Sequence, residues 1–157
     1  QRAAERLNGA ASFAFIGRKY NYPVALEGAL KLQELAYVPA QGYAAAEMKH
    51  GPIALMPDCV TIAIAPRDSV YGRMRDAMSQ IVSHGGPMIA VATEGDLEIA
   101  AHADEVWYVP AAPEWLMPIL TVVPLQLFSY HMGVLRNQDQ PYDVDHPRNL
   151  AKSVTVE

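Results

Sequence analysis

The sequence predicts a three-layer α/β/α sandwich in which a mostly parallel, doubly wound sheet lies between helices. Four short apolar runs, at residues 13–16, 60–65, 88–92 and 106–109, have the β-branched, turn-bounded character of buried parallel strands. Helical patterns alternate with these runs. Strand–helix alternation is typical of a parallel sheet with helices on both faces and right-handed crossovers.

The first helix is expected over residues 23–38, because Pro23 suits the first turn of a helix. Its charged side chains Glu27, Lys31 and Glu34 fall within an arc of about 60°, since each residue turns the helix by about 100°. Almost every other position is apolar or small, so we expect a narrow ionic stripe on an otherwise buried cylinder. This row suits general acid–base chemistry, because a lysine can bias how protons divide between two acids. The helix alone leaves a structural ion pair on a partly exposed stripe equally open.

An alanine-rich turn, 43–46, precedes the next candidate, His50. Gly51 and Pro52 stop a helix, which leaves His50 in its final turn or at its cap. The negative end of the helix dipole favours a protonated imidazole there. His50 therefore either donates a proton to an oxygen in a neighbouring site or only satisfies the terminal carbonyls.

A second helix follows the strand at 60–65, with Asp68 as its expected cap and Gly85-Gly86 as its end. The apolar residues on one face of this helix are Val70, Met74, Ala77, Met78 and Ile81. A shorter helix at 97–102 connects the third and fourth strands.

Residues 115–135 contain no formally charged side chain and approach the length needed to span a bilayer. Pro118 and Pro124 interrupt this stretch, and polar side chains occur within it. We therefore predict a buried helix at the heart of an assembly and no membrane. Beyond residue 135 the chain becomes a polar, irregular tail.

Composition excludes several classes of protein. A chain of 157 residues is expected to form one domain, and a net charge of −5 without a basic cluster argues against nucleic-acid binding. The one cysteine, Cys59, leaves no disulfide within the chain, which fits a reducing cytosol. No signal peptide is visible, and we expect the sequence to be a piece of a longer chain. The histidines show no metal-ligand spacing with one another or with Cys59, so we predict no metal.

Several motifs of nucleotide and phosphate sites are missing from the sequence. No Gly-x-Gly-x-x-Gly or Walker-type loop follows a strand, and no serine- or threonine-rich phosphate cradle occurs. A tail that carries Arg148 and Lys152 could fold over an anionic ligand and supply positive charge, or it could be a solvated chain end. The residues alone leave both readings of the tail open.

Four segments together resemble one family, the glutamine–fructose-6-phosphate aminotransferases: 15–18, 22–34, 44–53 and 148–157. The ending Arg-Asn-Leu-Ala-Lys-Ser-Val-Thr-Val-Glu at 148–157 is the most particular of them. The resemblance covers nearly the whole chain and implies a single SIS-type sugar-isomerase domain over 1–157, with an active-site tail at about 137–157. It implies that this is the second SIS half of the isomerase domain, and that the glutaminase domain and the first SIS half precede it.

The resemblance also implies roles for the residues of the first helix and for His50. Glu34 aligns with the acid–base that moves a proton between C1 and C2 of the open-chain sugar, and Lys31 and Glu27 align with partners in its proton network. His50 aligns with the residue credited with ring opening, which reaches the site from a neighbouring subunit.

For the tail, the resemblance implies that Lys152 engages the carbonyl of fructose 6-phosphate and that Ala151 makes backbone contacts with the sugar. It implies a cytoplasmic homodimer that makes glucosamine 6-phosphate without a metal or organic cofactor. Two alternatives share the fold: a sugar-phosphate-binding module of a transcriptional regulator, and a sugar-phosphate deaminase or deglycase.

Overall fold

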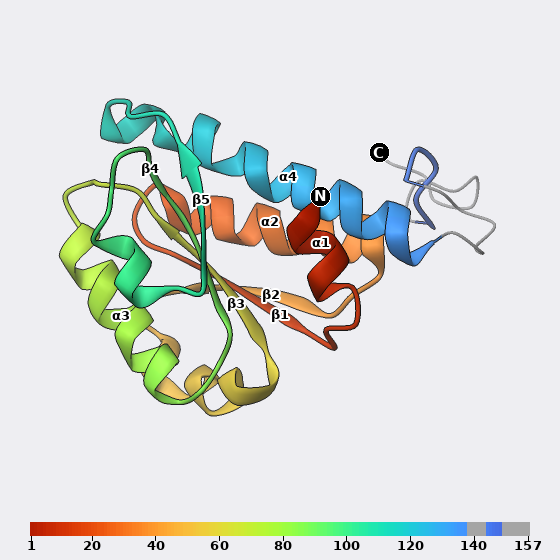
Figure 1. Ribbon diagram of the computed structural model, residues 1–157, viewed down its shortest axis with the longest axis horizontal. Helices are drawn as coiled ribbons and strands as arrows, with labels where there is room; N and C mark the ends of the chain where they lie inside the picture. The colour runs from red at the N-terminus through yellow and green to blue at the C-terminus, as the bar shows by residue number, and fades with distance from the viewer. Residues whose placement is uncertain (138–143, 149–157) are drawn as a thin grey trace.

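The computed structural model describes residues 1–137 and 144–148, and within them a parallel sheet lies between two layers of helices (Figure 1). The sheet has the strand order β2-β1-β3-β4-β5, and every neighbouring pair is parallel. The strands are β1 (Phe13–Gly17), β2 (Ala40–Ala44), β3 (Val60–Ala65), β4 (Met88–Thr93) and β5 (Glu105–Val109). The α-helices are α1 (Arg2–Leu7), α2 (Asn21–Ala36), α3 (Tyr71–Ser83) and α4 (Met117–Arg136). The predicted fold class is confirmed.

Side chains of the central strands divide between two cores, because neighbouring residues of a strand point to opposite faces. Phe13 and Phe15 of β1 belong to the core beneath α1, α2 and α4. Ala14 and Ile16 of the same strand belong to the core beneath α3. Strands β1, β3 and β4 are buried along their whole length, which explains why they read as continuous apolar runs in the sequence.

The edge strand β2 was not predicted, and the expected turn at 43–46 is wrong for its first two residues. β2 pairs with β1 from Phe13↔Ala40 to Gly17↔Ala44. Its residues Ala-Gln-Gly-Tyr-Ala include no β-branched side chain, so local preference gives no strand signal. A Cβ on Gly42 would lie 2.8 Å from the Leu26 Cα atom, so the glycine allows β2 to pass close beneath α2.

Helix α2 begins two residues before the predicted start and ends at Ala36, where Tyr37 adopts the left-handed conformation with φ 54°. The expectation of an otherwise buried cylinder is wrong. Tyr22, Leu26 and Leu30 are exposed in this chain, alongside the ionic row. The helix thus buries one face on the sheet and presents a second apolar face outward.

Helix α4 packs directly on α2. The Thr121 hydroxyl donates a hydrogen bond of 2.9 Å to the Asn21 side-chain oxygen, and both residues are buried. A Cβ on Gly28 would lie 2.8 Å from the Leu125 side chain, so the glycine brings the two helices together. Pro118 lies in the first turn, and Pro124 lies inside α4 without ending it.

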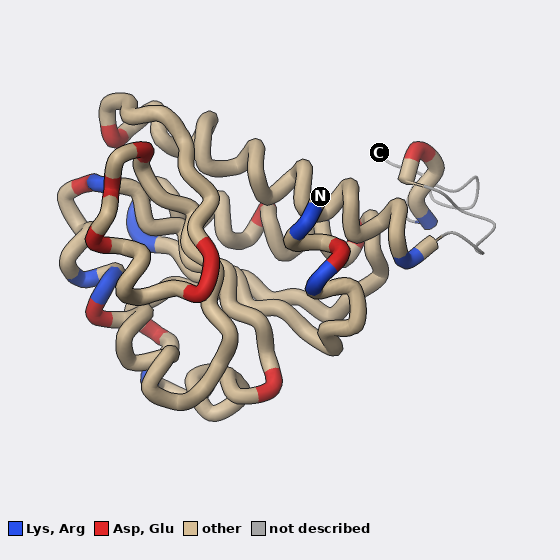
Figure 2. The backbone as a smooth tube through the Cα atoms, viewed as in Figure 1, with Lys and Arg blue, Asp and Glu red and all other residues tan. Residues whose placement is uncertain are grey.

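The helix predicted at 115–135 forms, and within this chain it buries one face; burial of its other face in an assembly stays a prediction. The other face exposes a row of large apolar side chains, here called the outer stripe: Trp115, Ile119, Val123, Leu127, Tyr130 and Val134. Figure 2 shows that α4 carries no charged residue before Arg136. By length and composition alone the stretch Glu114–Arg136 passes as a membrane span, a test that core helices of soluble proteins also pass.

Helix α3 covers the opposite face of the sheet. Its buried residues Met74, Ala77, Met78 and Ile81 are four of the five predicted for its inner face; the fifth, Val70, precedes the helix as its N-cap and is only half-buried. Asp68 does not cap the helix but accepts a hydrogen bond of 2.9 Å from the Val70 backbone N–H, in the turn that leads into it. Three-10 helices complete the described chain: η1 (Met48–His50), η2 (Pro52–Asp58), η3 (Ile99–His102), at the predicted 97–102, and η4 (Glu114–Leu116).

Candidate functional site

The predicted ionic row forms on the second half of α2. The Lys31 ammonium lies 2.6 Å from a Glu34 carboxylate oxygen and 3.7 Å from a Glu27 carboxylate oxygen. The side chains are 21–36 % exposed, so the row is neither sequestered nor fully solvated. The hydrogen bond from Lys31 to Glu34 raises the pKa of the Lys31 ammonium. Lys31 therefore stays protonated at neutral pH and keeps a positive charge in contact with the Glu34 side chain.

A carboxylate held ionised beside an ammonium can accept a proton from a carbon acid placed near it. Among the described residues, the row is the arrangement best suited to this, because its acid and its charge partner are in direct contact. Its partly open surroundings leave room for a ligand. The geometry is compatible with acid–base chemistry and also with a purely structural role, because the same contacts would serve a structural ion pair.

His50 ends η1 and is exposed, as its position before Gly51-Pro52 predicted. Within this chain it is not brought to Glu34, because β2 runs between the two. At the start of β2, the side-chain amide of Gln33, the neighbour of Glu34, donates to the carbonyl of Ala40. At its other end, Ala45 N–H donates to the Gly17 carbonyl, and η1 follows only there. His50 and Glu34 therefore lie toward opposite ends of β2.

The tail meets α2 at the helix end that carries Glu34. The backbone N–H of Arg148 donates a hydrogen bond of 3.0 Å to the Tyr37 hydroxyl, and the Arg148 guanidinium lies 4.3 Å from the centre of the Tyr37 ring. Figure 1 shows the end of α4 and the segment 144–148 beside the end of α2. Ala151 and Lys152, which were predicted to contact the sugar, lie outside the described residues.

The role of Tyr37 was missed from the sequence, where this residue was counted as part of the helix. Tyr37 instead forms the C-cap of α2 in a left-handed conformation, which is usually taken by glycine. No local pattern marks a tyrosine for that position.

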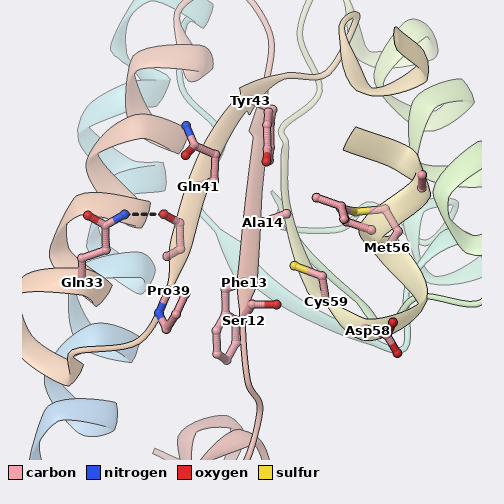
Figure 3. Close-up of a pocket in the computed structure, with 13 residues that line it drawn as sticks. Ser12, Phe13, Ala14, Gln33, Pro39, Gln41, Tyr43, Met56, Asp58 and Cys59 are labelled. Atoms are coloured by element: carbon pink, nitrogen blue, oxygen red, sulfur yellow. Dashed lines mark hydrogen bonds between the residues drawn. The ribbon is translucent and has the colours of Figure 1, made fainter. Parts of the chain in front are cut away.

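A pocket of about 440 Å³ lies at the amino ends of β1 and β2, beside η2 (Figure 3). Its lining is mostly apolar, with polar groups from Ser12, Tyr43, Asp58 and Cys59 among others. None of the predicted site residues that the structure describes lines this pocket. Burial raises the pKa of the Cys59 thiol, which makes this thiol a poor nucleophile at neutral pH. The pocket therefore offers no acid–base pair comparable to the row on α2.

The crevice at the carboxyl ends of β1 and β3 is the place where open parallel sheets usually bind ligands, because the strand order reverses there. Beside it, the Glu114 carboxylate accepts a hydrogen bond of 3.0 Å from the Ser69 hydroxyl and forms an ion pair with Lys19. The predicted proton-transfer residues are not part of this cluster, since Glu27, Lys31 and Glu34 lie on α2.

A charged network at the carboxyl ends of β3 and β4 was also not anticipated. Buried Asp96 accepts a hydrogen bond of 3.1 Å from the Arg67 guanidinium, and Glu98 contacts both Arg67 and Arg75. The sequence signal was present, because polar residues follow both strands directly. The network ties together the loops after β3 and β4.

No cluster of three or more His, Cys, Asp or Glu side chains suited to a metal ion occurs in the part of the chain that the structure describes.

Comparisons with a family model, with curated proteins and with solved structures give matches that agree with one another. The model of the SIS domain family matches residues 6–136. The chain is 52 % identical over 155 residues to a glutamine–fructose-6-phosphate aminotransferase (isomerizing) from Chlorobaculum tepidum, and 47 % identical over 155 residues to one from Thermus thermophilus. Each alignment covers 98 % of this chain and 25 % of the relative, so the chain spans about a quarter of the length of these curated relatives.

Among solved structures, the fold is similar to the C-terminal domain of a glucosamine–fructose-6-phosphate aminotransferase from Francisella tularensis. The TM-score is 0.79 at 28 % sequence identity. The match covers 87 % of this chain and 39 % of that one. The similarity therefore extends over sequence and fold together.

Proposed function

The chain belongs to the SIS domain family, and on that premise we propose that it is the second SIS half of the isomerase domain of a glutamine–fructose-6-phosphate aminotransferase. The enzyme would convert fructose 6-phosphate and glutamine-derived ammonia into glucosamine 6-phosphate. The observation that carries the proposal is the contact of Lys31 with Glu34 on α2, in a chain 52 % identical to such an enzyme. The glutaminase domain and the main phosphate grip would belong to other parts of the complete protein.

In the proposed reaction, Lys152 adds through its unprotonated amine to the C2 carbonyl of the open-chain sugar. Loss of water leaves an imine, which ammonia then displaces. Glu34 removes a proton from C1 of the resulting C2 imine, whose nitrogen takes up a proton, which gives an enolamine. Protonation of C2 and loss of the C1 hydroxyl proton then leave an aldehyde at C1 and an amine on C2. Lys31 places its ammonium 2.6 Å from Glu34 for the first of these transfers, with Glu27 as its second partner at 3.7 Å. Ala151 would contribute backbone contacts to the sugar.

Ring opening would come from His50 of a neighbouring copy. The support is geometric, because His50 and Glu34 lie toward opposite ends of β2 in one chain. A second copy could bring its own η1 to the α2 of the first. We therefore propose a homodimer, and the exposed outer stripe of α4 offers an apolar surface that such an assembly could cover. We also propose a cytoplasmic location, since the free thiol of Cys59 suits a reducing compartment.

The two alternatives have less support. A sugar-phosphate sensor needs a pocket but no contact between an acid and a lysine, and a deaminase would run related chemistry toward the release of ammonia. Identity of 43 % or more to aminotransferases over nearly the whole chain favours the synthetic reaction.

The test is an assay of the complete protein with fructose 6-phosphate and either glutamine or ammonia. The proposal expects glucosamine 6-phosphate to form with both nitrogen donors. A sensor would bind the sugar phosphate without turnover. A deaminase would release ammonia from glucosamine 6-phosphate and make no use of glutamine. Either outcome would overturn the proposal.

A further inference from the structure

The described part of the tail, 144–148, is docked onto the ends of α2 and α4 by several contacts. Pro147 is buried, and a Cβ on Gly133 of α4 would lie 2.6 Å from the Val144 side chain. The side-chain amide of Asn137 donates a hydrogen bond of 2.6 Å to the Leu35 carbonyl of α2, which fixes the chain just before the tail. The tail therefore returns to α2 rather than leaving the domain.

The last described residue of the tail, Arg148, makes its contacts with Tyr37. The Tyr37 hydroxyl accepts a hydrogen bond of 3.0 Å from the Arg148 backbone N–H, and the Tyr37 ring lies beneath the Arg148 guanidinium at 4.3 Å. An arginine that stacks on an aromatic face and is hydrogen-bonded through its backbone is held at two points. The side chain reaches Arg148 because Tyr37 takes the left-handed conformation at the end of α2.

Tyr37 therefore links the two predicted catalytic groups. It follows Glu34 by three residues, which is less than one helical turn, about 5 Å along the axis. Lys152 follows Arg148 by four residues, which span at most about 14 Å when fully extended. Tyr37 thus joins the helix that carries Glu34 to the residue four positions before Lys152.

We propose that Tyr37 is a positioning residue that holds the active-site tail so that Lys152 stays within reach of the sugar carbonyl beside Glu34. The inference rests on the proposed function for the role of Lys152. The docking itself stands on contacts of described residues alone.

The size of the effect on Lys152 depends on the length of chain that tethers this residue to its anchor. In the sequence, Lys152 follows Arg148 by four positions and Asn137 by fifteen. Release of the whole anchor therefore lengthens the tether from four residues to fifteen. The effective concentration of a tethered group falls as about the −3/2 power of tether length, so complete release lowers it about sevenfold. Loss of Tyr37 alone should cost about 1.4-fold where Pro147 still holds the chain, and up to about sevenfold where Val144 and Pro147 are released together with Arg148.

The first experiment measures docking without substrate, in the complete protein. Trypsin cleaves after arginine, so the rate of cleavage between Arg148 and Asn149 reports how often the anchor opens. Tyr37→Ala should accelerate this cleavage, and Tyr37→Phe should fall between the two, because it keeps the ring and loses the hydroxyl acceptor. The control is Tyr20→Ala, at the opposite end of α2 and about 24 Å away along the helix. Equal cleavage rates in Tyr37→Ala and wild type would overturn the anchor.

The second experiment measures the consequence for Lys152. Lys152 forms an imine with C2 of fructose 6-phosphate, with loss of water, and borohydride reduces this imine to a stable amine by delivering hydride to C2. Tyr37→Ala should lower the rate of trapping at Lys152 and kcat by the same factor, between about 1.4-fold and sevenfold, with an unchanged KM and partial rescue in Tyr37→Phe. Rates are normalised to folded protein well below the thermal midpoint, since a purely structural role would lower only the midpoint.

The outcomes distinguish the positioning role of Tyr37 from the proposed function. Trapping at the wild-type rate in Tyr37→Ala would overturn the positioning role while leaving the proposed function intact. A wild-type enzyme that forms no adduct at Lys152 would instead overturn the assigned role of that lysine. It would remove the positioning role with it, and the tryptic assay would still report whether the tail is docked.

Discussion

At the scale of single residues, the short contact between Lys31 and Glu34 distinguishes the two acids of the row. Glu34 is the better placed base, because Lys31 lies 2.6 Å from it and 3.7 Å from Glu27. The lysine cannot take over as a base at neutral pH, since its pKa is raised by the hydrogen bond to Glu34. Glu34 and Lys152 should therefore have separable roles.

Glu34→Gln in the complete enzyme should lower isomerisation by roughly 100-fold or more, because the amide keeps the shape of the side chain but cannot carry the proton. Binding of fructose 6-phosphate should remain, and borohydride should still trap the imine at Lys152. Glu27→Gln is the matched control and should cost less. Near-normal isomerisation in Glu34→Gln would mean that the row is structural.

Lys152→Arg should abolish the reducible adduct at that position, since a guanidinium stays protonated and does not form an imine. Mass spectrometry of the borohydride-treated protein checks this directly. Trapping as efficient in Lys152→Arg as in Glu34→Gln would exclude Lys152 as the group that engages the carbonyl.

Tyr71 gives a stability prediction that is independent of catalysis. Burial and the neighbouring Asp96 carboxylate disfavour the phenolate and raise the pKa of Tyr71 from 10.0 to about 12. Between these two values the unfolded chain loses the Tyr71 proton and the folded chain keeps it, so the free energy of unfolding should fall as pH rises. Denaturant unfolding across this window should show a shallower decline for Tyr71→Phe than for wild type. Parallel declines would show that other groups control the alkaline limit.

At the scale of elements, the sequence predicted the features whose signal lies within one segment of the chain, and missed those that depend on contacts between distant segments. Strands β1, β3 and β4 were predicted because they are buried on both faces and rich in apolar residues. Strand β2 was not, because pairing with β1 and the close approach at Gly42 define it, and neither is visible locally. The ionic row follows from helical spacing alone. The docking of Arg148 on Tyr37 does not, because it joins residues 111 positions apart.

The α2–α4 contact should tolerate no added side chain at Gly133. A Cβ there would lie 2.7 Å from the Leu35 carbonyl oxygen, which belongs to backbone and cannot rotate away. Gly133→Ala should therefore lower the free energy of unfolding by about 1–3 kcal/mol, the range for overpacking. Urea unfolding of the chain measures this.

Gly72→Ala on α3 is the matched control, because nothing lies within 4 Å of the added Cβ. That change should stabilise the chain by up to about 1 kcal/mol, since alanine favours helix over glycine. Equal stability of the two variants would show that the helices can separate without cost.

At the scale of the whole molecule, the two helical layers differ in how completely their apolar side chains are buried within the chain. The α3 layer completes its core within the described chain, and its buried residues match the sequence pattern. The α2–α4 layer presents Leu26 and Leu30 on one helix and the outer stripe on the other. The sequence hinted at this through its low charge content, but which side chains point outward depends on how α4 lies on α2.

The homodimer can be tested through the outer stripe. Leu127 is 55 % exposed, so Leu127→Asp should leave the fold intact and weaken self-association, because a carboxylate would be buried at an apolar contact. Sedimentation at tens of micromolar should show dimers for wild type and a shift toward monomer for the variant. Leu97→Asp, at a more exposed leucine away from α4, is the control. Dimers of equal strength in both variants would place the interface elsewhere.

The hydrogen bond between Asn21 and Thr121 joins positions 100 residues apart. Because α4 follows α2 at this distance along the chain, the domain cannot be completed during synthesis until α4 has been made. A ribosome adds roughly 5–20 residues per second, so the face of α2 that contacts α4 exists for about 5–20 s before its cover has been made. During that interval Gly28 and its neighbours form an apolar groove without its helix, on a nascent chain whose strands are already able to pair. The domain is therefore most exposed to chaperones, and to aggregation, in the seconds before translation reaches the end of α4.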